Sequence, residues 1–197
     1  MGDVFSEFAV MLFLAVYYVI PAYVANGLAV VTGGGTPIDL GRKFRDGRRI
    51  FGDGKTIRGF TGGVICGFLA GLLQMIAAPH LNSFIQQLIT AYGLNPAISF
   101  SAEAIVYTPP LRAFLLALGG LTGDLVGSFI KRRLNLERGR PAPLIDQLDF
   151  ICFALLFSYF ISPISWEYIV ILIVLTPIIH LIANIVAYWL KLKSVPW

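Results

Sequence analysis

Long, nearly uninterrupted apolar runs limit what this chain can fold into. Five of them have close to the roughly 20 residues that an α-helix needs to cross a bilayer. They are residues 8–31, 60–78, 113–130, 150–166 and 168–190. Charged residues make up 13% of the chain, whereas soluble domains contain about a quarter. The sequence therefore predicts an all-α integral membrane protein, a single transmembrane domain over residues 1–197 with five transmembrane helices.

Basic residues are segregated between the connections of this predicted bundle. Of the 15 Lys and Arg residues, seven lie in 32–59, five in 131–149 and two after residue 190, while Arg112 stands alone on the other side. The positive-inside rule places basic connections in the cytoplasm. With five spans, we expect the amino terminus outside, the carboxyl terminus in the cytoplasm and two functional cytoplasmic loops, 32–59 and 131–149. The protein is then a multi-pass protein of the cell membrane whose site faces the cytoplasm.

Glycines recur every four residues in the second and third predicted spans. Small residues at this spacing let neighbouring helix backbones approach closely. We expect them to pack helices, within one bundle or between two copies, so the oligomeric state stays open. They are Gly63, Gly67 and Gly71 in the second span and Gly119, Gly123 and Gly127 in the third.

The segment between these two spans carries apolar residues at helical spacing, at Leu81, Ile85, Leu88 and Ile89. This pattern is typical of an amphipathic helix on the membrane surface. A lid that packs on the bundle explains it equally well, and the sequence does not separate the two.

Two histidines and two asparagines in or near the spans lack the spacing of metal ligands. We expect His80 and His180 to be structural. Buried amides in membrane helices often hydrogen-bond to a neighbouring helix, so Asn26 and Asn184 are predicted to bridge helices.

Asp124 lies inside the otherwise apolar third span. Ser128 and Lys131 follow it by four and seven residues, which places the three side chains on one stripe of a helix. A charged group at membrane depth costs about 2.5–3.5 kcal/mol, so we interpret Asp124 as functional. The alternative is a protonated carboxyl or a structural ion pair with Lys131.

Asp146 and Asp149 lie three residues apart where the fourth span begins, and this spacing puts both on one helix face. A short connection favours neighbouring helices, so Asp124 is expected close to both. Carboxylates without His or Cys suit hard cations such as Mg²⁺, which phosphates help to hold. We therefore predict Mg²⁺ as cofactor, bound by Asp124, Asp146 and Asp149. The alternative is that Asp146 and Asp149 only complement a helix dipole.

The two basic loops are predicted to bind phosphates. In the second loop, Lys131, Arg132, Arg133, Arg138 and Arg140 surround the acidic residues. In the first loop, glycines alternate with charged residues, and Asp46-Gly47 and Asp53-Gly54 predict tight turns. Alternatively, the basic residues of both loops only set the orientation of the chain in the membrane or bind anionic lipid headgroups. The expected phosphate-binding residues are Asp53, Lys55, Thr56, Arg58, Ser128 and Arg133.

Two motifs resemble those of a known family. The run SFIKRR, from Ser128 to Arg133, followed by DQLD at 146–149, resembles the signature of CDP-diacylglycerol synthases, which are integral membrane cytidylyltransferases. Gln147 stands where that signature has Arg, and Arg138-Gly139 where it has Lys-Asp. With these departures and with the first-loop sequence PIDLGRKFRDGRRIFGDGKTIRG, the chain resembles the archaeal branch of the family, the CDP-archaeol synthases.

The resemblance implies transfer of a cytidylyl group from CTP to an isoprenoid ether lipid phosphate, 2,3-bis-O-geranylgeranyl-glycerol 1-phosphate, with release of pyrophosphate. Under this hypothesis Asp124, Asp146 and Asp149 hold Mg²⁺ against the nucleotide, and Lys131 and Arg132 neutralise the leaving group. Lys55 and Arg58 then close over the triphosphate or grip the lipid phosphate. We therefore expect the catalytic residues to be Asp124, Lys131, Arg132, Asp146 and Asp149.

The competing function is an ion- or proton-coupled transporter, because an intramembrane Asp together with proline inside a span also occurs in such carriers. Against it, the acidic residues gather toward one side and no inverted repeat is visible in the sequence. No nucleic-acid partner is needed to explain the basic residues.

Overall fold

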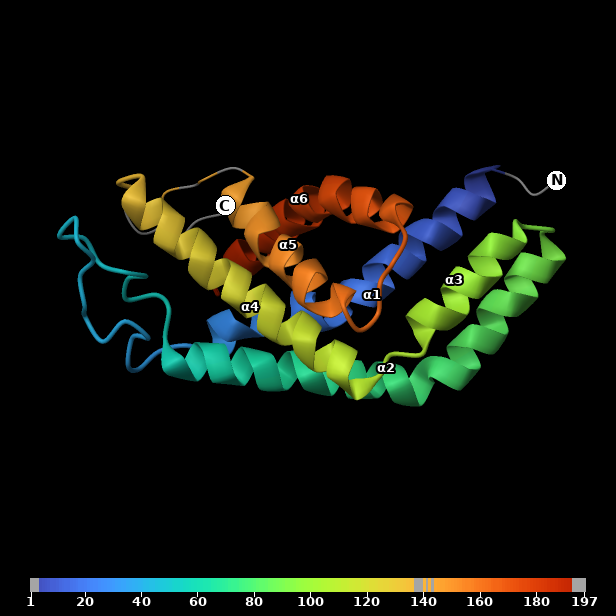
Figure 1. Cartoon of the computed structure of the whole chain (residues 1–197), viewed down its shortest axis with the longest axis horizontal. Helices are drawn as coiled ribbons and strands as arrows, with labels where there is room; N and C mark the ends of the chain where they lie inside the picture. Colours follow the sequence, from blue (N-terminus) through green and yellow to red (C-terminus); the bar gives the residue numbers. More distant parts are fainter. Residues whose placement is uncertain (1–3, 137–139, 141, 143, 193–197) are drawn as a thin grey trace.

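The computed structural model describes residues 4–136, 140, 142 and 144–192, and it folds into an elongated helical bundle (Figure 1). Arg138 and Gly139 lie outside the described residues. In chain order the helices are α1 (Val4–Thr32), α2 (Ile57–Ala91), α3 (Pro96–Val106), α4 (Pro110–Arg133), α5 (Ile145–Tyr159) and α6 (Trp166–Trp189). The loop 33–56 forms one end of the bundle, and the end of α2 with α3 forms the other.

Four of the helices, α1, α2, α4 and α6, are long and apolar enough to cross a bilayer. They cover every predicted span except 150–166. The all-α architecture is therefore confirmed, and four of the predicted spans form helices long and apolar enough to cross a bilayer, but the prediction of five transmembrane helices is wrong.

The fifth predicted span fails because its helix is short. α5 has 15 residues, about 22 Å of helix, whereas the hydrocarbon core is roughly 30 Å thick. Residues 160–165 leave the helical conformation before α6 begins. In this turn Ser162 accepts hydrogen bonds from Tyr18 and Arg112. The run 150–166 is apolar enough to span, but a turn held by the bundle divides it.

Arg112, the basic residue on the side away from the loops, is a buried structural residue. Its guanidinium donates to the carbonyl oxygens of Ala104 and Ile105, and to the hydroxyls of Thr108 and Ser162. The same group lies 4.8 Å from the centre of the Tyr18 ring. It thereby joins the end of α3, the start of α4 and the turn between α5 and α6.

The end of the bundle opposite the loop is a hairpin of α2 and α3. α2 has 35 residues with Pro79 inside it, and Figure 1 shows that it changes direction in its second half, as a proline kink does. Beyond the kink, Ile85 and Ile89 are buried in the same core cluster as α1 and α3. The segment after Ala78 is thus packed on the bundle, which is the second of the two alternatives that the sequence left open.

The start of α1 and the end of α6 lie toward opposite ends of the bundle. Glu7 in α1 accepts a hydrogen bond from the Asn95 backbone in the hairpin, over 2.9 Å. Leu192, after α6, lines a cavity that the loop 33–56 also lines. The cytoplasmic orientation of this loop end stays a prediction.

Both glycine series pack helices within this one chain. A Cβ on Gly63, Gly67 or Gly71 of α2 would collide with α1 or α4, and one on Gly119, Gly123 or Gly127 of α4 would collide with α5. α4 therefore lies in close contact with α2 on one side and α5 on the other, which brings the acidic residues of α4 and α5 together.

This packing makes a testable prediction about Gly67 and Gly27. A Cβ on Gly67 would meet the Pro21 carbonyl and the Ala25 and Ala117 side chains, whereas nothing lies within 4 Å of one on Gly27. Overpacking costs about 1–3 kcal/mol, so Gly67→Ala should lower the thermal midpoint of unfolding in detergent. Gly27→Ala, the matched control in a helix, should leave it unchanged or raise it. Equal midpoints for the two variants would contradict this packing.

Candidate functional site

A cavity of about 1200 Å³ opens between the loop 33–56 and the bundle. It is larger than the roughly 300–1,000 Å³ that one small ligand occupies. All helices except α3 contribute residues to its wall. Its basic lining residues are Lys43, Arg48, Arg49, Lys55, Lys131, Arg132 and Arg140, and its aliphatic and Phe residues include Val30, Val31, Phe60, Leu121, Leu125, Phe150 and Ile179. Such a cavity suits one ligand, or two, that combine phosphates with hydrocarbon.

The loop owes its shape to Asp39, whose side chain is fully buried. This carboxylate accepts hydrogen bonds from the Arg49 guanidinium and from the backbone N–H groups of Gly41, Phe51 and Gly52. Burial alone disfavours the charged carboxylate, but these donors outweigh burial and hold the pKa of Asp39 well below its usual range. The buried anion therefore orders a loop that contains little regular structure.

Two arginines fasten the ordered loop to the end of α4. Arg48 donates to the carbonyl oxygens of Arg132 and Arg133, in the last turn of the helix, where the carbonyl groups lack the usual helical donors. In return, Arg133 donates to the Arg49 carbonyl oxygen and pairs with Asp46 over 3.2 Å. Arg133 thus has a structural role rather than a place in the cavity wall.

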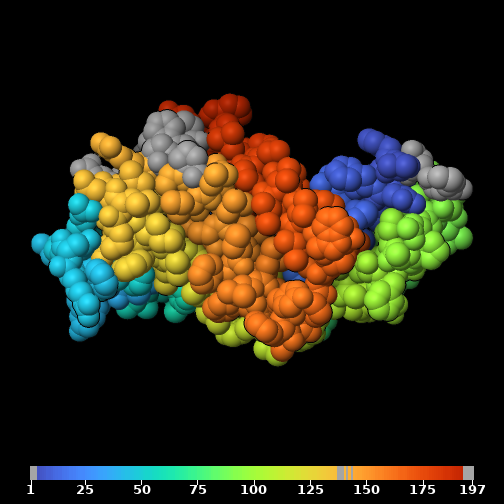
Figure 2. Space-filling model, turned by 45° about the horizontal axis from the view of Figure 1, so that its top comes forward, coloured from blue at the N-terminus to red at the C-terminus, as the bar shows by residue number. Residues whose placement is uncertain are grey.

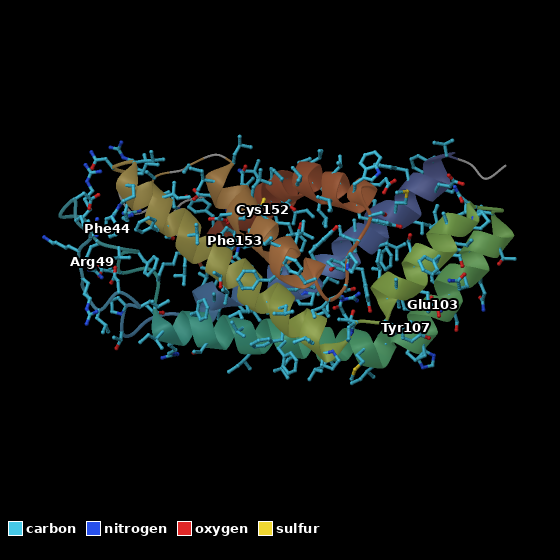
Figure 3. The ribbon with its side chains drawn as sticks, in the orientation of Figure 1. Phe44, Arg49, Glu103, Tyr107, Cys152 and Phe153 are labelled. Atoms are coloured by element: carbon cyan, nitrogen blue, oxygen red, sulfur yellow. The ribbon has the colours of Figure 1, made fainter. Side chains whose placement is uncertain are left out.

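Aromatic contacts reinforce this attachment. The Arg133 guanidinium lies 4.8 Å from the ring centres of Phe44, in the loop, and Phe129, in α4. Figure 2 shows the loop packed beside α4 at one end of the molecule, and Figure 3 places Phe44 and Arg49 at that end, with Glu103 and Tyr107 at the other.

An ion pair in the cavity wall, which we call the central ion pair, joins the loop to the membrane-embedded part of the chain. The Lys55 ammonium donates to Asp124 of α4 over 2.5 Å, and both side chains are about three-quarters buried. Asp53 and Gly54, just before Lys55, form the predicted tight turn, closed by a hydrogen bond from the Lys55 N–H to the Gly52 carbonyl. The structural partner of Asp124 is therefore Lys55, and not Lys131.

A second ion pair lines the same cavity. Lys131, at the end of α4, donates to Asp146, at the start of α5, over 2.5 Å. Asp146 also accepts a hydrogen bond from the Ala142 N–H, so it fixes the chain entering α5. Each of the two ion pairs consists of a lysine and an aspartate, and each joins two segments that are separate in the sequence.

Asp149 lies behind the cavity wall, against α4. Its carboxylate fills the space beside Gly127, where any Cβ would collide with it. Burial, followed by the nearby Asp124 carboxylate, raises the pKa of Asp149 to about 7. Asp149 is therefore coupled to Asp124 by charge, although Asp146 and Asp149 do not both face the cavity.

The described residues contain no group of three His, Cys, Asp or Glu placed to hold a metal ion. The lysine partners of Asp124 and Asp146 occupy those carboxylates. Nevertheless the donors fit Mg²⁺, which proteins commonly bind with one or two carboxylates together with substrate phosphates. The site of three carboxylates stays a prediction.

The remaining candidates differ in where the structure places them. Ser128, Arg132 and Asp53 line the cavity. Thr56 lines the cavity too, but its hydroxyl accepts a hydrogen bond from the Gly59 N–H and caps the start of α2. Arg58 is exposed and does not contribute to the wall.

Sequence reasoning missed Asp39, Arg48 and Arg49. A usable signal existed for Asp39, because Asp followed two residues later by Gly is typical of a turn closed by the Asp side chain. Gly41 does adopt a positive φ of 79° here, and its N–H donates to Asp39.

The fold and the cavity define the class of protein: an integral membrane protein with a cavity that both basic and apolar residues line. A solved structure of an intramembrane enzyme for archaeal membrane lipid biosynthesis has a similar fold, with a TM-score of 0.63 and 39% identity over 87% of this chain and 92% of that chain.

Residues 8–197 match the family model described as CarS-like: CDP-archaeol synthase. CDP-archaeol synthases of Methanocaldococcus jannaschii and Thermococcus gammatolerans are 46% and 50% identical over 95% and 94% of this chain, and over 98% and 96% of their own lengths. The chain therefore belongs to the CDP-archaeol synthase family, and it is a membrane cytidylyltransferase. These findings confirm the family resemblance and give no support to a transporter.

Asp39 should be the residue on which loop order depends. Because hydrogen bonds to a charged group contribute about 1.5–3 kcal/mol, Asp39→Asn should speed tryptic cleavage within the loop by at least about tenfold. The low pKa keeps Asp39 ionised, so the difference from the wild type should be constant between about pH 5 and 9 and shrink only in more acidic solution.

Asp53→Asn is the matched control, because Asp53 also pairs with Arg49 but its side chain is 66% exposed. It should change the cleavage rate little. Equal cleavage rates for Asp39→Asn and the wild type would show that the buried carboxylate does not order the loop.

Proposed function

We propose that the cavity joins CTP to 2,3-bis-O-geranylgeranyl-glycerol 1-phosphate, forming CDP-archaeol and pyrophosphate. The observation that carries this proposal is that one cavity combines lysines and arginines of the loop and of the end of α4 with apolar residues of the helices; we call these its basic half and its apolar half. The basic half suits the nucleotide triphosphate and the lipid phosphate, and the apolar half suits the beginning of the lipid chains. We further propose that the basic half faces the cytoplasm, in line with the positive-inside rule.

The chemistry requires positioning and charge neutralisation more than proton transfer. An oxygen of the lipid phosphate attacks the α-phosphorus of CTP, and the bond from that phosphorus to the bridging oxygen of the β-phosphate breaks. Pyrophosphate leaves with that electron pair. A phosphate monoester has a second pKa of about 6, so the nucleophile is largely dianionic and needs no general base. The main barrier is the approach of two polyanions, which fixed cations lower.

The two lysines of the ion pairs are suited to this task. Lys55 and Lys131 are held at the cavity wall by Asp124 and Asp146. Each ammonium is thereby aimed before substrate arrives, and each can exchange its carboxylate partner for a phosphate. Arg132, in the same wall, is the third cation that we assign to the leaving pyrophosphate.

Mg²⁺ fits the carboxylates that such an exchange would free. Asp124 and Asp146 line the cavity, and Asp149 is coupled to Asp124 by charge; these are the residues that would hold the ion. When bound, Mg²⁺ supplies positive charge to the triphosphate. In the metal-free protein, Lys55 and Lys131 are the ion-pair partners of these two partly buried carboxylates.

We propose a route for the lipid chains between the helices that line the cavity. α6 packs against α1 and α5, but within the described residues it contacts neither α2 nor α4. Residues of α2, α4 and α6 nevertheless line the same cavity. We infer that the isoprenoid chains lie between these helices while the phosphate stays at the basic wall.

The direct test is incubation of detergent-solubilised protein with α-labelled CTP, with and without the lipid phosphate. A labelled lipid and released pyrophosphate are expected only when both substrates and Mg²⁺ are present, and EDTA should abolish both products. Failure to form labelled lipid with this lipid or with phosphatidic acid, by protein shown to be folded, would refute the proposal.

Variants of the central ion pair test the assigned roles. Lys55→Gln and Asp124→Asn should each lower kcat by at least about hundredfold, because removal of one electrostatic contact to a transition state has effects of this size. Arg42→Gln is the matched control in the same loop, since Arg42 is exposed and outside the cavity wall; it should retain activity.

The double variant of Lys55→Gln with Asp124→Asn separates catalysis from folding. It leaves no unpaired buried charge, so its thermal midpoint should exceed that of either single variant while its activity stays lost. Recovery of activity in the double variant would show that the pair is only structural.

A further inference from the structure

One wall of the cavity carries polar side chains that the proposed reaction does not use. Asn26 of α1 and His180 and Asn184 of α6 all line the cavity. The sequence predicted that the asparagines bridge helices and that His180 is structural. The placement of all three in one cavity wall instead suggests contact with a ligand.

The α6 part of this wall is held in place. Asn184 and His180, one helical turn apart, are hydrogen-bonded between Nδ2 and Nδ1 over 3.2 Å. The His180 ring lies beside Phe150, with 6.3 Å between ring centres, and Phe150 lies beside Tyr23 of α1, at 5.6 Å. The Tyr23 hydroxyl bonds to Thr176 of α6 over 2.8 Å. These contacts connect α6 to α1 and orient the His180–Asn184 pair.

Asn26 stands one helical turn after Tyr23 on α1, and it is partly buried. Its side chain makes none of the hydrogen bonds found among the described residues. An amide in a largely apolar wall is stable there only if water or a ligand satisfies it. Its two N–H donors and one carbonyl oxygen are therefore available to a molecule in the cavity.

The chemistry of the wall points to uncharged oxygen atoms next to hydrocarbon. None of the α1 and α6 residues in the wall is charged, and the neighbours of Asn26 and Asn184 there include Val30, Ile179 and Ala183. Phosphates would bind poorly to such a surface. Among the described residues α6 contacts neither α2 nor α4, although all three helices line the cavity.

We propose that Asn26, which lines the same cavity as the His180–Asn184 pair, binds the glycerol backbone of the lipid substrate by donating hydrogen bonds to its ether oxygens. Ether oxygens only accept hydrogen bonds, and they lie between the phosphate and the isoprenoid chains. The wall thereby sets how deep the lipid sits and places its phosphate at the basic wall. This inference rests on the proposed function, since it assigns a binding site for the same lipid substrate.

The test is the Michaelis constant of each substrate, measured separately in mixed micelles for Asn26→Leu, which keeps the side-chain shape without the donors. The KM for the lipid phosphate should rise about five- to tenfold, as expected for one or two lost hydrogen bonds, while the KM for CTP stays within about twofold. Asn26→Ser, which keeps a donor, should recover part of the loss. Asn82→Leu in α2, outside the cavity wall, is the matched control and should change neither constant.

Other outcomes overturn the inference. A rise in the KM for CTP alone would assign the wall to the nucleotide. Unchanged constants, or a lower thermal midpoint with both constants raised equally, would show a structural role. If Asn26→Leu does not fold, the affinity of Asn26→Ser for the lipid phosphate is measured in the absence of CTP. An affinity equal to that of the wild type would count against the inference. Absence of any labelled lipid from the wild type would instead refute the proposed function.

Discussion

The ion pair between Lys55 and Asp124 is the interaction on which the site depends. Asp124 belongs to a helix that crosses the apolar bundle, where an unpaired charge is costly, and its partner comes from outside that bundle. The loop must therefore fold down onto α4 to supply the lysine. The buried anion of Asp39 and the crossed contacts of Arg48 and Arg133 with α4 and the loop make that fold possible. The ordered loop thus stabilises the Asp124 carboxylate, and the ion pair with Asp124 in turn holds the loop on α4.

Close backbone packing supplies the rest of the geometry. Because glycines face α5 along α4, the start of α5 lies directly beside Asp124, and Gly127 leaves room for the Asp149 carboxylate. A larger residue there would collide with that carboxylate. α6, in contrast, contacts only α1 and α5 among the described helices. The helices that carry the acidic residues are therefore closely packed, whereas α6 is attached to the bundle through α1 and α5 alone among the described helices.

The features that could be predicted from the sequence are those in which a residue is unusual for the segment that contains it. Asp124 in an apolar span and the glycine spacing have direct physical meanings, so four spans and much of the cavity wall were predictable. α5 was not, because composition does not show that Ser162 closes a turn within an apolar run. Thr56 was read as a ligand for phosphate although a helix cap explains its hydroxyl. Asp39 looked like one more charge in a charged loop, since its burial arises only from tertiary contacts.

The central claim is that the nucleotide binds between the two lysine–aspartate pairs. A structure of the protein with Mg²⁺ and a CTP analogue that has a methylene group between its α- and β-phosphates tests it most directly. We expect the triphosphate in the cavity, in contact with Lys55 and Lys131, with at least one of their aspartates released toward the metal ion. A nucleotide bound outside this cavity, or bound within it while both ion pairs stay closed, would show that the lysine–aspartate pairs do not form the nucleotide site.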